Sequence, residues 1–194
     1  MLKDKDLVGL KKPDLSIYMG NVKVSNLKKY ISKSVMDECI SKVDKPKDKA
    51  LIIFLWMTGT RVSECINIRR EHLLFEDGFI RIRWLKSRKF FERLIPMHHK
   101  LKQFLWLYTT ALKHDALVFP ISRQRVEQIT KKWLGCSPHK VRHSFAVNFV
   151  QQSKHPGSMR ILQKILGHNN INTTMKYLDY VPVDQAEELN KVEY

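Results

Sequence analysis

The feature that most constrains the fold is an unbroken apolar run of eight residues, from Ala50 to Met57. The segment around it, KPKDKALIIFLWMTG, is apolar on nearly every side of a helix, so other elements must enclose that helix. Gly59 is expected to end it. Eight residues are far fewer than the ~20 that cross a bilayer, and the N-terminus lacks the apolar core of a secretory signal. The run predicts the central helix of a globular, cytoplasmic protein that is neither secreted nor bound to a membrane.

Helical periodicity dominates the rest of the chain, with one interruption. After Asp77 and Gly78, the segment FIRIRWL (79–85) alternates apolar and basic side chains, which predicts a strand with one buried and one cationic face. A second strand, FFERLIP (90–96), completes a basic hairpin. Helices are predicted over residues 32–43, 45–59, 60–68, 98–114, 122–135, 139–153, 158–168 and 170–178. The predicted fold class is therefore mainly α with a small antiparallel β-sheet (α+β).

Three regions are expected along the chain. Residues 1–30 are polar, rich in lysine and weakly periodic, and are interpreted as an arm or linker. Residues 31–181 hold all the predicted elements and form the main domain. Residues 182–194 are acidic, with apolar residues at helical spacing, so they predict an amphipathic tail helix.

The distribution of charge indicates the kind of partner. The chain carries 35 Lys and Arg against 19 Asp and Glu, a net charge of +16. Residues 81–103 hold eight basic residues and one acidic residue, and residues 121–177 hold ten and one, so these two stretches account for the whole excess. Such an excess repels itself unless a polyanion neutralises it. Nucleic acid is therefore the predicted partner.

Two arginines follow predicted helix starts. Arg61 comes after Gly59 in TGTRVSE, where a simple pairing with Glu64 is one interpretation. In PHKVRHSFA, His139 and Arg142 lie one helical turn apart on the same face. A planar guanidinium holds two phosphate oxygens at once, and a helix N-terminus attracts anions. The pair therefore fits either an oxyanion clamp or a solvated, basic helix start.

Metal and nucleotide cofactors are not expected. His139 and His143 have the spacing of a zinc pair, but no Glu lies between them and no third ligand is evident. The three cysteines, Cys39, Cys65 and Cys136, form no CxxC pair. The sequence contains neither GxxxxGK[ST] nor a dense acidic cluster for magnesium. A metal-dependent nuclease and an NTPase are therefore disfavoured, and no cofactor is predicted.

Four segments, taken in order, carry a resemblance to a known family. They are TGTRVSE (58–64), the hairpin IRIRWLKSRKFFERLIP (80–96), HKVRH (139–143) and LGHNNINTTMKYL (166–178). Together they resemble the catalytic domain of the tyrosine recombinases, or phage-type integrases, whose pattern is TGxRxSE, a hairpin lysine, HxxRH and LGHxxxxTTxxY. The resemblance covers roughly Ser32 to Val181. It implies that residues 31–181 adopt the tyrosine recombinase catalytic-domain fold.

The resemblance also implies roles for residues around a scissile phosphate. Arg61 and Arg142 correspond to the two arginines that clamp it. His139 corresponds to the histidine of HxxR, and His168 to the histidine of LGH. The full catalytic set that the resemblance implies is Arg61, Lys86, His139, Arg142, His168 and Tyr177.

The nucleophile and the general acid come from the last motif and the hairpin. Tyr177 corresponds to the nucleophile, although a tyrosine at that helical spacing, taken alone, is typical of a core. Tyr180 and the terminal Tyr194 do not keep the nine-residue interval that separates His168 from Tyr177. The general acid is expected to be Lys86. Lys89 is the alternative, because this hairpin is longer than is usual for the family.

The implied activity is site-specific DNA recombination, as in the integration of viral or plasmid DNA in a prokaryotic cell. Such an integrase cleaves and rejoins strands through a 3′-phosphotyrosyl intermediate without metal or ATP. A type IB topoisomerase-like or telomere-resolving enzyme shares this chemistry and stays open as an alternative. A non-catalytic DNA-binding module of the same fold is the other alternative.

The expected partners are double-stranded DNA and further copies of the chain. The resemblance implies a homo-oligomer, a tetramer on paired sites, and a monomer or dimer away from DNA. The tail is expected to dock on its own domain or on a neighbouring copy. Because only about thirty polar residues stand where the family usually has an N-terminal helical domain, the chain alone is expected to bind duplex DNA weakly, with steep salt dependence. Further basic residues predicted to contact DNA are Arg81, Arg83, Arg88, Lys89, Arg123, Arg125 and Lys140.

Overall fold

This computed structural model describes residues 30–86 and 89–180, with side chains for residues 30–83 and 91–180. Most of the described residues are helical, and the strands form one antiparallel sheet in the order β1-β2-β3. The predicted fold class is therefore confirmed. The elements in chain order are α2 (Lys33–Ser41), α3 (Pro46–Thr58), α4 (Val62–Ile66), η2 (Arg70–His72), β1 (Leu73–Leu74), β2 (Phe79–Lys86), β3 (Lys89–Pro96), α5 (His99–Thr109), α6 (Arg123–Leu134), α7 (Pro138–Gln152), α8 (Ser158–Leu166), α9 (Asn172–Met175) and η3 (Leu178–Tyr180).

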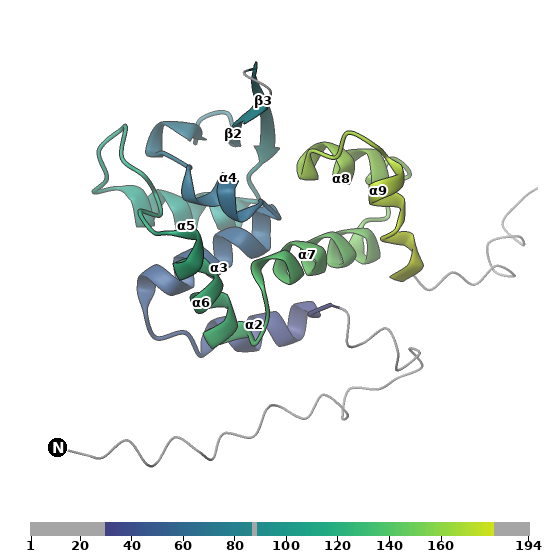
Figure 1. Cartoon of the computed structure of the whole chain (residues 1–194), viewed down its shortest axis with the longest axis horizontal. Helices are drawn as coiled ribbons and strands as arrows, with labels where there is room; N and C mark the ends of the chain where they lie inside the picture. Colours follow the sequence, from purple (N-terminus) through teal and green to yellow (C-terminus); the bar gives the residue numbers. More distant parts are fainter. Residues whose placement is uncertain (1–29, 87–88, 181–194) are drawn as a thin grey trace, which may run out of the picture.

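The helices surround α3, and the hairpin projects from them. Figure 1 shows β2 and β3 extending from one end of the molecule, with α8 and α9 beside them and α7 below. Helix α3 packs against α5, α6 and α7, and α8 packs against β3. The arm predicted for residues 1–30, apart from Tyr30, and the tail predicted for 182–194 lie outside the described residues. No helix in the described ranges combines the length and the apolar character needed to span a membrane.

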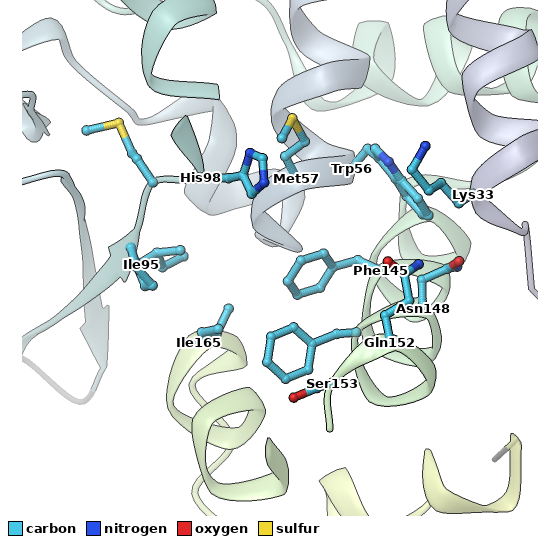
Figure 2. Close-up of a pocket in the computed structure, with 13 residues that line it drawn as sticks. Lys33, Trp56, Met57, Ile95, His98, Phe145, Asn148, Gln152, Ser153 and Ile165 are labelled. Carbon is cyan, nitrogen blue, oxygen red and sulfur yellow. The ribbon is translucent and has the colours of Figure 1, made fainter. Parts of the chain in front are cut away.

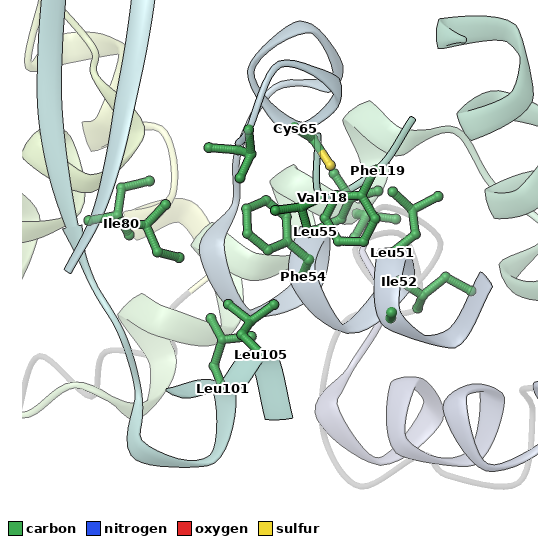
Figure 3. Packing of buried hydrophobic residues seen from close by; sticks show 14 of the residues in the cluster. Leu51, Ile52, Phe54, Leu55, Cys65, Ile80, Leu101, Leu105, Val118 and Phe119 are labelled. Carbon is green, nitrogen blue, oxygen red and sulfur yellow. The ribbon is translucent and has the colours of Figure 1, made fainter. Parts of the chain in front are cut away.

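The core forms around the apolar run, as the sequence predicts. Leu51, Ile52, Phe54 and Leu55 of α3 are each at most 1% exposed. Figure 3 shows these side chains packed with others from α5, the sheet and the segment before α6. Each such buried side chain contributes roughly 1.5–3 kcal/mol relative to an exposed one. Helix α3 is therefore the fixed element to which the neighbouring segments are attached.

Gly59 ends α3 and lets α7 approach it. Its φ of 60° is left-handed, which glycine adopts without strain. A Cβ at this position would lie 2.3 Å from Cδ1 of Phe145 on α7. Any larger residue would therefore displace the Phe145 ring, which packs α7 against the end of α3. The glycine therefore allows two of the four motifs to meet.

The sheet has the buried face and the cationic face that the alternation predicts. Ile80 and Ile82 are buried, whereas Arg83 on the other face is exposed. The register pairs Ile80 with Ile95 and Ile82 with Arg93. The buried face therefore contains an arginine of β3, which the sequence analysis does not predict.

Three details differ from the predicted elements. Elements η2 and β1 were not predicted, because they are too short to show a periodicity in the sequence. Helix α5 ends at Thr109 rather than at residue 114, because the carbonyls of His114 and Ala116 accept backbone hydrogen bonds from Glu71 and Arg70, at 2.8 and 2.9 Å. The helix predicted over 170–178 is divided into α9 and η3. For α5, hydrogen bonds to a distant segment thus outweigh local helical propensity.

Candidate active site

Arg61 stands at the corner between α3 and α4, directly before the first turn of α4. Its backbone N–H donates to Oε2 of Glu64 at 2.7 Å, and its Nη1 donates to Oε1 at 2.9 Å. The Glu64 carboxylate thereby caps the helix. The Arg61 side chain remains 46% exposed. The pairing considered from the sequence is therefore present, and it holds an accessible guanidinium at the surface.

Glu64 has a second partner, which the sequence analysis missed. Arg93 donates from Nη1 and Nη2 to the two carboxylate oxygens, both at 2.9 Å, and from Nε to the carbonyl of Ile165 at 3.0 Å. Burial raises the pKa of Glu64, but the hydrogen bonds and charges of Arg93 and Arg61 outweigh it, so the pKa lies below its ordinary value. The sequence could have indicated this contact. Arg93 lies two residues before Ile95 on the same strand, so both side chains lie on the buried face of the sheet.

Arg142 lies in the first half of α7, a helix capped by Ser137 and started by Pro138. The residue is 6% exposed. Its Nη1 donates to the Gly59 carbonyl at 2.6 Å, and its Nη2 donates to the Leu166 carbonyl at 2.8 Å. Burial, together with two neighbouring arginines, lowers its pKa to about 10. Arg142 therefore remains a cation at neutral pH, held in a fixed orientation, and its charge attracts a phosphate.

His168 orients Arg142 from the other side. Its Nε2 lies 3.2 Å from Nη2 of Arg142, and its Nδ1 lies 2.9 Å from Oγ1 of Thr174. A guanidinium can only donate, so Nε2 accepts and the proton sits on Nδ1, which donates to Thr174. Burial and three nearby arginines lower the pKa of His168 to about 4, so the neutral ring is the stable form at pH 7.

Arg61, Arg142 and His168 line one cavity of about 500 Å³. We call it the cation cleft, and the chemistry-bearing residues that line it are Arg61, Arg123, Glu127, His139, Arg142 and His168. His139 is exposed at the start of α7. Among the described residues, no group of three or more His, Cys, Asp or Glu is placed to hold a metal ion. The structure thus brings four of the six predicted catalytic residues, Arg61, His139, Arg142 and His168, to the lining of one cavity.

Tyr177 lies beside the cation cleft, in the turn between α9 and η3. It lines an adjoining hollow of about 540 Å³, which shares His139, Arg142 and His168 with the cleft. The centre of its ring is 5.4 Å from that of His143. Burial raises the pKa of Tyr177 above its ordinary value, although Arg142 opposes the shift. The phenol is therefore protonated at neutral pH and needs a base to become a nucleophile.

The predicted residues of the hairpin are placed in part. The register pairs Lys86 with Lys89, so the backbones of both lie at the far end of the hairpin. Their side chains, and the whole of Arg88, lie outside the described residues. Arg83 is exposed, whereas Arg81 is half-buried and its buried Nε has no hydrogen-bond partner among the residues that are described. The choice between Lys86 and Lys89 stays a prediction.

The other predicted DNA contacts flank the cation cleft. Arg123 and Arg125 are exposed in the first turn of α6, and Arg123 lines the cleft itself. Its Nε lies 3.3 Å from Oε1 of Glu127. Lys140 is partly exposed in the first turn of α7. These positions are compatible with a polyanion that lies across the cleft, and DNA contact at each of them stays a prediction.

A separate hollow of about 500 Å³ lies between α3, α7, α8 and the end of β3. Figure 2 shows its mostly apolar lining, which includes Trp56, Met57, Phe145 and Ile165. Apolar side chains offer no charge to a phosphate. The candidate active site is therefore the cation cleft rather than this hollow.

Comparison with known proteins identifies the family of the chain. The sequence pattern of the phage integrase family matches residues 26–182, and the chain belongs to that family. A tyrosine recombinase of Pseudothermotoga lettingae is 31% identical over 160 residues, which are 75% of this chain and 54% of that protein. Tyrosine recombinase XerA of Pyrococcus horikoshii is 28% identical over 181 residues, which are 86% and 62% of the two chains. This chain therefore spans little more than half the length of these relatives.

Solved structures share the fold. The catalytic domain of bacteriophage HP1 integrase matches with a TM-score of 0.63 at 19% identity, over 84% of this chain and 94% of that one. XerH site-specific recombinase, in a pre-cleavage complex with its difH substrate, matches with a TM-score of 0.65 at 19% identity, over 90% and 57% of the chains. At this level of identity the likeness shows a common fold.

Proposed function

We propose that this chain cleaves and rejoins double-stranded DNA as a site-specific recombinase, an integrase, with Tyr177 as its nucleophile. The cation cleft is the observation that carries the proposal. Arg61 and Arg142 line one cavity with His139 and His168, and the hollow of Tyr177 shares three of these four residues. Relatives named tyrosine recombinases, at 28–31% identity, support the same activity.

The charge of the site matches the reaction. Arg61, Arg93 and Arg142 surround a single carboxylate, Glu64, which leaves two net positive charges. A DNA phosphodiester carries one negative charge, and attack by a phenolate adds a second in the transition state. Fixed cations stabilise charge that develops on phosphoryl oxygens without reorganising during the reaction. The side chains of this chain thus supply the electrostatic stabilisation that the transfer requires.

The proposed step is a transesterification in which every proton has a donor and an acceptor. The Tyr177 phenol gives its proton to a base, for which His139 is the candidate, and its oxygen attacks the phosphorus. The bond from phosphorus to the 5′ oxygen breaks, and that oxygen takes a proton from the hairpin lysine, Lys86 or its alternative Lys89. The products are a 3′-phosphotyrosyl bond and a free 5′-hydroxyl. Because the covalent bond keeps the energy of the phosphodiester, the reverse step rejoins the strand without ATP.

The proposed partners follow from the charge and the fold. Duplex DNA lies across the cation cleft, with the basic hairpin and the start of α6 on either side. Two sites are paired by a homo-tetramer, and the tail, residues 182–194, docks on its own domain or on a neighbouring copy and controls access of Tyr177 to the phosphate. The chain alone binds duplex DNA weakly and with steep salt dependence. Deleting the tail is expected to change cleavage or self-association.

The test is capture of the covalent intermediate on DNA. The chain is incubated with fragments of its source genome, and denaturant-stable adducts are sequenced to map the cleaved site. A duplex with a nick close to that site then traps the adduct, because the short cleaved fragment diffuses away. We expect an adduct in the presence of EDTA, none with Tyr177→Phe, and an undiminished yield with the matched control Tyr180→Phe.

The outcomes separate the alternatives. Recombinant products from two paired sites support the proposal. Relaxed circles or hairpin ends alone indicate a topoisomerase-like or telomere-resolving enzyme. A lack of any adduct on DNA that the chain binds specifically indicates a non-catalytic module and overturns the proposal.

A further inference from the structure

We propose that Arg93 is a positioning residue, which occupies Glu64 so that Arg61 stays available to the phosphate. The inference rests on the proposed function and deepens it. Its basis is the three-residue cluster in which a single buried carboxylate serves two arginines from different elements. Arg93 comes from β3 of the hairpin, and Arg61 precedes α4.

The two arginines hold the carboxylate in different ways. Arg93 forms a two-pronged contact with both oxygens of Glu64, at 2.9 Å each, and its side chain is only 9% exposed. Arg61 makes one side-chain bond to the same carboxylate and is 46% exposed. Two-pronged, charge-assisted contacts are the stronger kind. Arg93 is therefore the principal counter-ion of Glu64, and Arg61 is the secondary one.

Removal of Arg93 would leave Arg61 as the counter-ion of Glu64. The Glu64 side chain is 4% exposed, so its charge needs a partner inside the protein. Among the side chains that the structure describes, the other cation bonded to this carboxylate is the guanidinium of Arg61, which already contacts Oε1. That guanidinium would then close on the carboxylate with its own fork. Its charge would be neutralised, and its donors would turn away from the cation cleft.

Arg93 is fixed in its place from a second direction. Its Nε donates to the carbonyl of Ile165 at 3.0 Å, at the end of α8. Gly167, in the LGH motif, has a φ of 65°, and a Cβ there would lie 2.9 Å from Nη1 of Arg93. The glycine thus leaves the room in which the Arg93 side chain lies. The side chain of Arg93, on the hairpin, thus contacts Glu64 of TGTRVSE and lies beside Gly167 of the LGH motif.

The first experiment measures binding of inorganic sulfate, a tetrahedral dianion that stands in for the phosphate. The full chain is titrated with sulfate at constant ionic strength, and the rise in Tm gives the affinity. We expect Arg93→Met to weaken sulfate binding by about 10-fold or more, since one arm of the clamp is withdrawn. Arg93→Lys keeps the positive charge but not the two-pronged contact, and its sulfate affinity is expected to lie between those of the wild type and Arg93→Met. The matched control is Arg160→Met, an exposed arginine of α8, which is expected to bind like the wild type.

The double variant distinguishes positioning from simple support of the fold. Glu64→Gln removes the charge that captures Arg61, so Arg93→Met with Glu64→Gln is expected to recover sulfate affinity to within about 3-fold of the wild type. A merely structural role predicts the opposite, because removing both partners would not restore anion binding. The double variant also lacks an unpaired buried carboxylate, so it keeps the test valid if Arg93→Met alone does not fold.

The results separate this inference from the proposed function. If the wild type does not bind sulfate, the clamp itself is wrong and the inference falls with it. If the wild type binds and Arg93→Met binds equally well, the inference is overturned while the clamp stands. If Arg93→Met and the double variant bind sulfate equally weakly, Arg93 does not act through Glu64, and the inference is again overturned.

A second readout uses the mapped DNA site with sulfur in place of the bridging 5′ oxygen. A thiolate leaves without a general acid, because the pKa of a thiol is about 8.5. Loss of the hairpin lysine is expected to be rescued by this substrate, whereas the cleavage defect of Arg93→Met is not. Rescue of Arg93→Met by sulfur would mean that Arg93 acts by directing the hairpin lysine, and would overturn the route through Arg61.

Discussion

The two walls of the cation cleft hold their arginines by different means. On the wall formed by the start of α7 and His168, Arg142 is buried and bonded to the carbonyls of Gly59 and Leu166. On the wall formed by the start of α4, Arg61 is half exposed and bonded to the carboxylate of Glu64. Backbone carbonyls are neutral at every pH and belong to fixed elements. A carboxylate carries a charge that titrates and for which other cations compete.

The difference predicts where each wall is vulnerable. The Arg142 wall is part of the folded core, so damage to it affects stability and activity together. On the Arg61 wall, Arg61 itself is half exposed, so replacing it reduces activity while the fold persists, whereas the buried pair of Glu64 and Arg93 also stabilises the fold. In the proposed function, the phosphate is therefore held between one rigid and one adjustable cation.

The largest expected effect comes from replacing the arginines by lysine, one wall at a time. A lysine cannot reach the acceptors of Arg142 together, so Arg142→Lys leaves a buried carbonyl unpaired and costs about 2–3 kcal/mol of unfolding free energy, with a loss of cleavage of about 10³-fold. Arg61→Lys still pairs with Glu64 near the surface and costs about 0–1 kcal/mol, with a cleavage loss of about 10²-fold. Urea unfolding and single-turnover adduct formation measure the two quantities. Equal losses of stability in the two variants would remove the distinction between the walls.

The next effect is the acid dependence of the Glu64 network. The pKa of Glu64 in the folded chain lies below its ordinary value of about 4.3, so the network stabilises the fold above that pH and loses the contribution as the pH falls through the folded pKa. At pH 7 we expect Glu64→Gln to be less stable than the wild type by about 3 kcal/mol. The gap is expected to narrow steadily below pH 4.5 in urea unfolding. A gap that stays constant down to pH 3 would show that Glu64 is not held as a carboxylate.

The smallest expected effect concerns the hydrogen bond between His168 and Thr174, which supports the Arg142 wall. Thr174→Val removes the acceptor of the His168 Nδ1 proton but keeps the shape of the side chain. The ring that accepts from Arg142 is then less firmly fixed, and we expect cleavage to fall about five- to tenfold, with little change in DNA affinity. Thr110→Val, on the exposed end of α5, is the control. An unchanged cleavage rate in Thr174→Val would mean that Arg142 needs no support from His168.

The sequence predicts the residues that line the cation cleft better than those that support them. Arg61, His139, Arg142 and His168 stand in short motifs, and α3 is recognisable from its apolar run, so their convergence follows once the helices pack. The contact of Arg93 with Glu64, which supports Arg61, joins positions 29 residues apart, and its strand was interpreted only as the second strand of a basic hairpin. The direction of the proton on His168 depends on Arg142 and Thr174 together, which no local pattern contains. Such long-range pairs need the folded coordinates.

The central claim is that both walls close on one anion. A crystal structure of the full chain grown with tungstate, a heavy tetrahedral dianion located by its anomalous signal, tests this directly. We predict a single tungstate in the cation cleft, with the guanidinium groups of Arg61 and Arg142 both within hydrogen-bond distance of its oxygens. Tungstate bound by only one of the two arginines, or bound elsewhere while the cleft holds none, would contradict the account.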